Sequence, residues 1–198
     1  MASHDYLFRT HWRVRASPEE VADVLKDAAA LPKWWPAVYL SADEIESGDE
    51  NGVGKVVELH TRGWLPYTLR WSLRVTESFY PKGFAIAATG DFDGTGRWTI
   101  EPDGPWTDVF YDWKIRAEKP FLRRLSWLLK PVFAANHRWA MSRGLESLRL
   151  ELKRQRAGTA AARDRVAAPP RPARSAALFV GVAAASLLAG LVYRRARR

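Results

Sequence analysis

The segment 66–77 alternates apolar and polar side chains, and this pattern limits the fold of the chain more strongly than any other. An alternation of this length is typical of a strand with one buried and one wet face. A similar segment begins at Tyr6, and others lie near 38–46, 53–61, 83–92, 95–102 and 106–117. Turns rich in Gly and Asp join them in series. The series therefore predicts an antiparallel sheet with one solvated face.

Two short helical segments are predicted between the first and second strands. Ser17 is suited to cap a helix, Pro18 fits its first position, and Glu20 completes a capping box. This helix should run to about residue 29, and a second short turn should contain Trp34 and Trp35. The sequence thus indicates a helical connection after the first strand.

A long helix is predicted from residue 120 to about residue 155, where Pro131 should kink it or divide it in two. Beyond that proline one apolar stripe recurs at spacings of three and four, made of Ala134, His137, Met141, Leu145, Leu148 and Leu152. A long amphipathic helix lying on a curved antiparallel sheet is an α+β arrangement.

Three segments carry a resemblance to a known family: SPEEVADVLKDAAALPKWWPAV, TDVFYDWKI and NHRWAMSRGLESLRLEL. With the order of the elements, they are similar to the polyketide cyclase/dehydrase and lipid-transport family of the START-like (SRPBCC) superfamily, over residues 5–155. The resemblance implies a helix-grip (START/Bet v 1-like) fold. In it, about seven strands wrap around a long C-terminal helix, with a hydrophobic cavity between them. Members include lipid and quinone carriers, hormone and polyketide binders, and some cyclases, so the fold does not choose among these functions.

Trp34 and Trp35 form either a lid over a ligand or a plug that seals the core. In the family that this chain resembles, the two short helices close one end of the cavity and support the long helix, so packing is the favoured interpretation. The cavity mouth is then expected at the other end, at the 61–67 connection and the start of the long helix. The residues predicted to form the mouth and contact a membrane are Trp64, Leu65, Phe121, Leu122, Arg123 and Arg124.

The apolar faces of the strands and of the long helix predict the lining of the cavity. The predicted ligand-binding residues are Trp12, Tyr67, Leu69, Trp71, Phe84, Ile86, Trp98, Tyr111, Trp113, Phe133, His137 and Met141.

Proton-transfer chemistry in such a cavity would need an acid or a base that points inward. The candidates are His137, Tyr67 and Tyr111, but a structural role for His137 is favoured because no carboxylate can be placed beside it. The four histidines show no metal-ligand spacing, and no phosphate-binding loop is present, so no metal and no cofactor are expected.

The charge of the chain is divided unequally. Residues 1–152 carry 20 Lys and Arg against 21 Asp and Glu, whereas residues 153–198 carry 11 Lys and Arg and one Asp. The net charge of +9 therefore belongs to the tail, which argues against nucleic-acid binding by the folded part. The chain has no cysteine, hence no disulfide framework.

The tail predicts a membrane anchor. Residues 176–193 contain no charge over 18 positions and are followed by a basic stretch at 194–198. This predicts a single C-terminal transmembrane helix. A disordered linker is expected at 158–175, and a ligand-binding domain at 1–157 should lie in the cytoplasm because no secretory signal precedes it. Small residues at a spacing of four within the span also allow weak dimerisation.

Three hypotheses follow. The favoured one is a membrane-tethered module that binds or transfers a lipophilic small molecule, such as a lipid, an isoprenoid or a polyketide-like aromatic compound. The second is an enzyme, a cyclase, aromatase or dehydratase acting on a polyketide-like substrate. The third is a packing or interaction domain whose ten tryptophans fill the cavity themselves.

Overall fold

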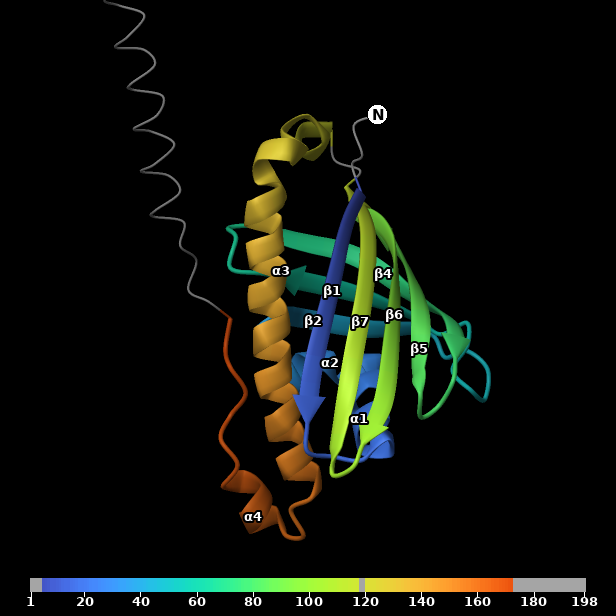
Figure 1. Ribbon diagram of the computed structural model, residues 1–198, viewed down its shortest axis with the longest axis vertical. Coiled ribbons are helices and arrows are strands. Elements are labelled where there is room, and N and C mark those ends of the chain that lie inside the picture. Colours follow the sequence, from blue (N-terminus) through green and yellow to red (C-terminus); the bar gives the residue numbers. More distant parts are fainter. Residues whose placement is uncertain (1–4, 118–119, 173–198) are drawn as a thin grey trace, which may run out of the picture.

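Seven antiparallel strands form one curved sheet that wraps around a long helix in the computed structural model (Figure 1). The structure describes residues 5–117 and 120–172, with the side chains of 6–115 and 131–172. The strand order across the sheet is β1-β7-β6-β5-β4-β3-β2. The strands are β1 Asp5–Val14, β2 Tyr39–Glu46, β3 Val56–Arg62, β4 Thr68–Ser78, β5 Gly83–Gly90, β6 Phe92–Asp103 and β7 Trp106–Ala117.

The predicted alternation of the strands is confirmed. Along β1, Tyr6, Trp12 and Val14 are buried, whereas Leu7 on the opposite face is 76% exposed. β1 pairs with β7 without interruption, from Asp5 opposite Arg116 to Val14 opposite Thr107. The inner face of the sheet thus supplies one half of a hydrophobic core.

The helix signals are confirmed at the start of α1, which spans Pro18–Lys26. The Ser17 hydroxyl accepts a hydrogen bond from the Glu20 amide, and the Glu20 carboxylate accepts one from the Ser17 amide at 2.8 Å. Glu20 also pairs with Arg156, just beyond the long helix, and this pairing lowers the pKa of Glu20 to about 2. The capping box therefore also ties α1 to the C-terminal end of that helix.

The helix α3 runs from Pro120 to Gln155 as one element with Pro131 inside it, so the proline does not divide it. Figure 1 shows its first part, in yellow, at an angle to the rest. Met141, Leu148 and Leu152 of the predicted stripe are buried. The described part of the predicted linker is not simply extended, because it contains the short helix α4, Ala160–Asp164, beside α3.

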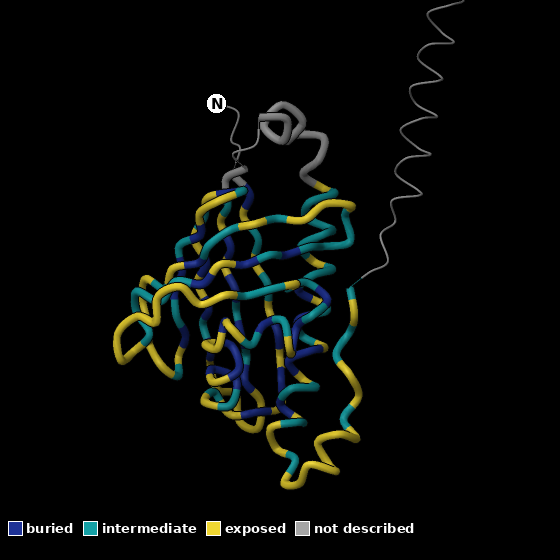
Figure 2. Tube along the Cα trace, turned by 180° about the vertical axis from the view of Figure 1, so that it is seen from behind, coloured by how far each residue is buried: buried dark blue, intermediate teal, exposed yellow. Residues whose placement is uncertain are grey.

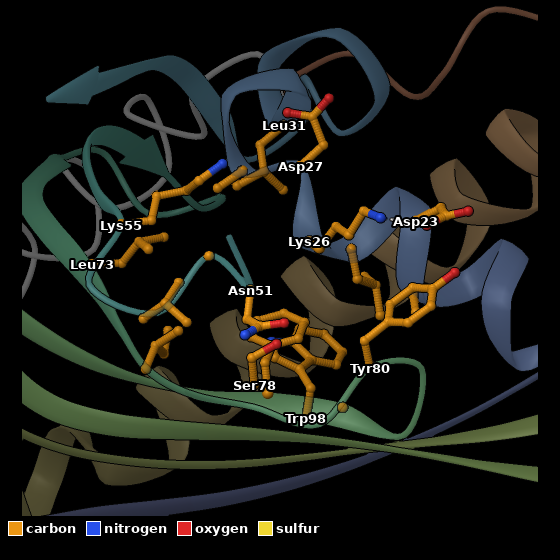
Figure 3. Close-up of a pocket in the computed structure, with 18 of the residues that line it drawn as sticks. Asp23, Lys26, Asp27, Leu31, Asn51, Lys55, Leu73, Ser78, Tyr80 and Trp98 are labelled. Atoms are coloured by element: carbon orange, nitrogen blue, oxygen red, sulfur yellow. Dashed lines mark hydrogen bonds and ion pairs between the residues drawn. The ribbon is translucent and has the colours of Figure 1, made fainter. Parts of the chain in front are cut away.

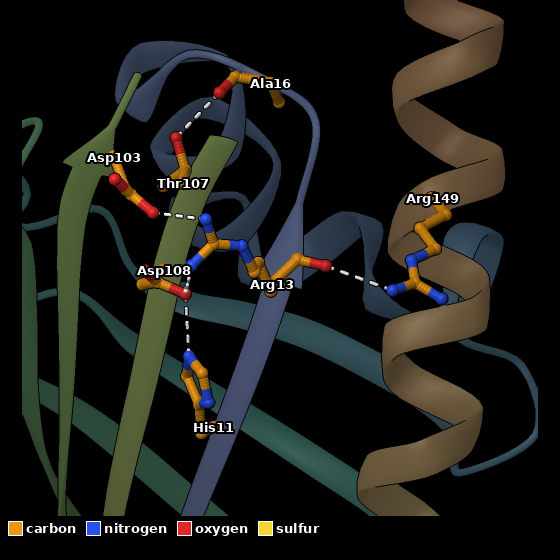
Figure 4. A network of polar contacts seen from close by, with 7 residues as sticks. All are labelled: His11, Arg13, Ala16, Asp103, Thr107, Asp108 and Arg149. Atoms are coloured by element: carbon orange, nitrogen blue, oxygen red, sulfur yellow. Dashed lines mark hydrogen bonds and ion pairs between the residues drawn. The ribbon is translucent and has the colours of Figure 1, made fainter. Parts of the chain in front are cut away.

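The outer face of β1 and β7 carries a network of ion pairs and hydrogen bonds (Figure 4). Arg13 pairs with Asp103 and Asp108, and Asp108 also contacts the His11 ring at 2.7 Å. Arg149 of α3 donates a hydrogen bond to the Arg13 carbonyl oxygen at 3.0 Å. Exposed pairs of this kind contribute about 0–1 kcal/mol each, so the network aligns the edge of the sheet more than it stabilises the fold.

The loop between β2 and β3 differs from the prediction. A strand was expected from residue 53, but β3 begins at Val56, because Gly52 and Gly54 have positive φ angles that end the pairing. The loop projects from the sheet and is mostly exposed (Figure 2). It leaves an opening opposite α1.

Trp34 and Trp35 are packed inside the protein, in agreement with the plug interpretation. They lie at the end of the short helix α2, Leu31–Trp34, which follows the 3-10 turn η1, Ala28–Ala30. They are only 2% and 3% exposed. Trp35 lies so close to α3 that a Cβ atom on Gly144 would be 2.3 Å from its Cζ2 atom. A glycine at this position of the helix is therefore needed for the indole to fit.

The predicted transmembrane segment, 176–193, lies outside the described residues and stays a prediction. Within the residues that the structure describes, no helix combines the length and the apolar character needed to cross a bilayer.

The contact between Trp35 and Gly144 gives a testable prediction. Ala normally stabilises a helix interior by about 1 kcal/mol relative to Gly. Here the added methyl group overlaps the indole, so Gly144→Ala should lower the free energy of unfolding by about 1–2 kcal/mol in denaturant titrations. Ser142→Ala, at an exposed position of the same helix, is the matched control and should change it by less than about 0.5 kcal/mol. A more stable Gly144→Ala variant would contradict the described packing.

Candidate functional site

The larger cavity, of about 680 Å³, lies between the inner face of the sheet and the short helices. Its walls come from α1, the η1–α2 segment, β4, β5 and β6, with Met141 from α3. The apolar side chains among them include Leu25, Leu31, Leu73, Val75, Phe84, Ile86 and Trp98. This volume is within the usual range for sites that enclose a small molecule.

The rim of this cavity is polar (Figure 3). It is formed by α1 and the residue after it, the β2–β3 loop and the β4–β5 turn, through Asp23, Lys26, Asp27, Asn51, Lys55, Ser78 and Tyr80. The Lys26 ammonium group lies 2.6 Å from Asp23 Oδ1, which raises the pKa of Lys26, and 4.7 Å from the centre of the Tyr80 ring. Polar groups therefore meet solvent at the opening, and apolar groups form the interior.

A second cavity of about 190 Å³ lies on the other side of a row of side chains. It is lined by Tyr6 and Phe8 of β1, by Thr61 of β3, and by Phe133 and His137 of α3. The side chains that line both cavities are Trp35, Tyr39, Trp71, Tyr111 and Met141. We refer to these five as the partition.

His137 is held in the smaller cavity by packing. Its ring stacks on Phe8 with 4.3 Å between centroids, and its Nε2 atom lies 3.4 Å from Thr10 Oγ1. Burial, with a smaller effect from Arg138, lowers the pKa of His137 to about 4. Among the described residues no carboxylate hydrogen-bonds to this ring. His137 is therefore neutral at physiological pH.

The tyrosines among the candidates are also in their neutral form. Burial raises the pKa of Tyr67 to about 12, although this residue is 38% exposed. Tyr111 is only 8% exposed, and burial raises its pKa well above the usual range. Both can donate a hydrogen bond at neutral pH, whereas neither is a base.

The structure places eleven of the twelve predicted lining residues on the wall of one or both cavities. Trp12 is the exception, because it packs in the core between Trp35 and Trp98, at centroid distances of 5.7 and 5.4 Å. Sequence reasoning missed Tyr39 and the polar rim. Contact of any of these residues with a ligand stays a prediction.

Of the predicted mouth residues, the two whose side chains are described, Trp64 and Leu65, do not border the larger cavity. Trp64 and Leu65 are partly buried in the β3–β4 loop, which is tied to α3 by a 2.9 Å hydrogen bond from the Trp64 amide to Asn136 Oδ1. This loop borders only the smaller cavity, through Gly63 and Tyr67. The side chains of Phe121, Leu122, Arg123 and Arg124 lie outside those described.

Metal-binding groups are not gathered in the described part of the chain: it holds no cluster of three or more His, Asp or Glu side chains that could bind an ion. The inner surface instead offers aromatic faces and hydroxyl groups. Such a surface can enclose an apolar molecule and orient it through a few hydrogen bonds.

The comparisons with known proteins agree with this geometry. The family described as polyketide cyclase / dehydrase and lipid transport matches residues 8–153. No curated protein matches the chain.

Similar solved structures include a protein of Thermus thermophilus, 20% identical, with a TM-score of 0.60 over 74% of this chain and 98% of that one. The Zhui aromatase/cyclase of a Streptomyces species is 17% identical, with a TM-score of 0.61 over 80% and 98%. A START superfamily protein of Mycobacterium smegmatis is 18% identical, with a TM-score of 0.51 over 68% and 97%. At these identities the likeness establishes the fold alone.

The pKa of His137 gives a prediction for the pH dependence of stability. Its folded-state pKa of about 4 lies below the value near 6.5 of an unfolded chain, so the unfolded state binds the proton first as the pH falls. Between pH 6.5 and pH 5 this should cost about 1–2 kcal/mol of unfolding free energy. His137→Gln should remove that part of the slope in denaturant titrations. His60→Gln is the matched control, because His60 lies on the opposite face of the sheet. An unchanged slope in His137→Gln would contradict a buried neutral imidazole.

Proposed function

Because the chain belongs to the polyketide cyclase/dehydrase and lipid-transport family, we propose that it binds a lipophilic small molecule in the larger cavity. A lipid, an isoprenoid or a polyketide-like aromatic compound has the required character. The main observation in support of the proposal is a cavity of about 680 Å³ with apolar walls and a polar rim. This space is open even though the chain has ten tryptophans, which argues against a domain filled by its own side chains.

The energetics favour an apolar ligand. Removal of about 300 Å² of apolar ligand surface from water would contribute roughly 7 kcal/mol at 25 cal/mol per Å². Loss of translational and rotational freedom on binding offsets about 4 kcal/mol or more of this. The apolar interior alone would therefore give weak to moderate affinity. Any higher affinity must come from specific polar contacts.

The enzymatic alternative needs an acid and a base beside the substrate. At the rim of the larger cavity Lys26 pairs with Asp23, and Lys55 pairs with Glu44 at 3.2 Å. The smaller cavity is lined by Arg62 and by Asp91, whose carboxylate accepts a hydrogen bond from the Arg70 amide at 2.9 Å. The buried groups His137 and Tyr111 are neutral. This distribution supports binding or transfer over acid–base catalysis.

Cavity filling tests the proposal. Val75 of β4 lines the larger cavity, whereas its neighbour Thr76 is exposed and lies outside that cavity. Val75→Trp should reduce the affinity for an uncharged apolar probe, such as diphenylhexatriene, at least tenfold, measured as energy transfer from tryptophan. It should cost roughly 1–3 kcal/mol of stability through overpacking.

Thr76→Trp is the matched control, since it adds the same side chain on the opposite face. It should bind the probe like the wild-type protein. Failure of the wild-type protein to bind any apolar probe would refute the proposed function.

We further propose that residues 176–193 anchor the ligand-binding domain to a membrane, with that domain in the cytoplasm. The part of the linker beyond α4, residues 165–175, would span roughly 18 Å as a flexible chain, which keeps the cavity within reach of the bilayer. Trp64, Leu65, Phe121, Leu122, Arg123 and Arg124 are proposed to touch the interface, and the anchor could also support weak dimerisation.

Two charges placed in the predicted span test the anchor. In the double variant Leu187→Arg, Leu188→Arg, each arginine should cost several kcal/mol of insertion free energy. The variant should therefore move from the membrane fraction to the supernatant. Arg163→Ala with Arg165→Ala, in α4 and just after it, is the control and should leave fractionation unchanged. A wild-type protein found only in the supernatant would refute the anchor and leave the cavity proposal intact.

A further inference from the structure

Two tyrosines belong to the partition between the cavities. Tyr39 is the first residue of β2, and Tyr111 lies in the middle of β7. Both line both cavities, and they are close enough for a charge on Tyr39 to raise the pKa of Tyr111. Strands from opposite parts of the sheet thus bring two phenol side chains to the partition.

Both phenol rings are held in fixed positions. Tyr111 stacks on Trp98 with 4.1 Å between centroids, and on Trp113 with 5.6 Å. Tyr39 packs against the edge of Trp35 at 5.2 Å. A Cβ atom on Gly96 would be 2.8 Å from the Tyr111 hydroxyl oxygen, so this oxygen lies directly against the backbone of β6. The hydroxyl position depends on a glycine opposite it.

Neither hydroxyl has a hydrogen-bond partner among the described residues. The partition also contains two indole N–H groups. That of Trp71 donates to Thr61 Oγ1 at 3.1 Å, whereas that of Trp35 is buried without a partner among the described residues. Neither tyrosine oxygen is among the buried side-chain atoms without a partner, so both hydroxyl groups are accessible from the cavities. A ligand oxygen at this point could accept hydrogen bonds from them.

The surroundings define the ligand group that fits. Burial raises the pKa of both Tyr39 and Tyr111, so both keep their protons and can donate. His137, beyond them in the smaller cavity, is neutral. The charged groups on the cavity walls are at the rim of the larger cavity, where Lys26 and Lys55 lie, and in the smaller cavity, where Arg62 and Asp91 lie. Between them the two phenol groups can donate to an uncharged carbonyl oxygen, which accepts two hydrogen bonds.

We propose that Tyr39 and Tyr111 together donate hydrogen bonds to an uncharged carbonyl-type oxygen of the bound lipophile, such as that of a ketone, a quinone or an ester. This inference rests on the proposed function and specifies its ligand class. The apolar body of the ligand fills the larger cavity, and its oxygen lies at the partition.

The test uses two probes of the same shape, fluorene and fluorenone, which differ by one carbonyl oxygen. Their affinities for the full-length protein are measured by equilibrium dialysis. Tyr111→Phe and Tyr39→Phe should each lower the affinity for fluorenone about 3- to 10-fold, the usual effect of losing one neutral hydrogen bond. The affinity for fluorene should change less than about twofold, because no hydrogen bond to it is lost.

A second readout needs no ligand. Because the Tyr111 hydroxyl has no partner in the protein, Tyr111→Phe should not lower the unfolding temperature of the ligand-free protein. A clear decrease would show that the hydroxyl stabilises the fold, which would overturn the inference.

The outcomes separate this inference from the function on which it rests. If both probes bind the wild-type protein and both variants equally well, the hydroxyl pair does not recognise the ligand, and the cavity still binds lipophiles. Equal losses for both probes would indicate displaced rings and would also overturn the inference. If neither probe binds the wild-type protein, the proposed function fails as well.

Discussion

The contact between Trp35 and Gly144 is the point on which the rest of the structure depends. Through it α3 meets the segment that follows α2, and Trp35 also packs against Trp12 of the sheet and against Tyr39. A buried indole removes a large apolar area from water, which makes it an effective link between layers. The short helices, the sheet and the long helix are therefore joined at one side chain.

The same contact explains why a cavity remains. Trp35 supports α3 at Gly144 and forms part of the partition, so it separates the two cavities and does not fill either one. The tryptophans on the walls lie against neighbouring rings, as Trp98 does against Tyr111. Aromatic side chains in this protein therefore shape the walls of a cavity.

Much of the fold could be predicted because its signals are local. The alternation along β1, the capping box at Ser17 and the stripe through Met141 and Leu148 each depend on residues within a few positions of one another. Whether Pro131 kinks α3 or divides it could not be decided this way, since tertiary packing decides whether a proline ends a helix. The loop before β3 was misjudged because the effect of its glycines depends on their φ angles.

The site was predictable only in part, for a related reason. The alternation of a strand tells which side chains face inward, and this placed Ile86 and Tyr111 on the wall. It does not distinguish a wall from solid core, which is why Trp12 was misplaced. The rim is formed by α1 and by two loops that are distant from it in the sequence. Tyr39 lies at the irregular start of an edge strand. The local sequence therefore predicts neither the rim nor the position of Tyr39.

Native mass spectrometry of the full-length protein, purified from its source under mild conditions, detects an uncharged lipophile in the cavity if one is bound. We expect a protein species with the added mass of one small molecule. Organic extraction should recover that molecule as a neutral compound that contains a carbonyl oxygen. A spectrum with only the mass of the polypeptide, together with an extract that contains no such compound, would contradict the proposed function.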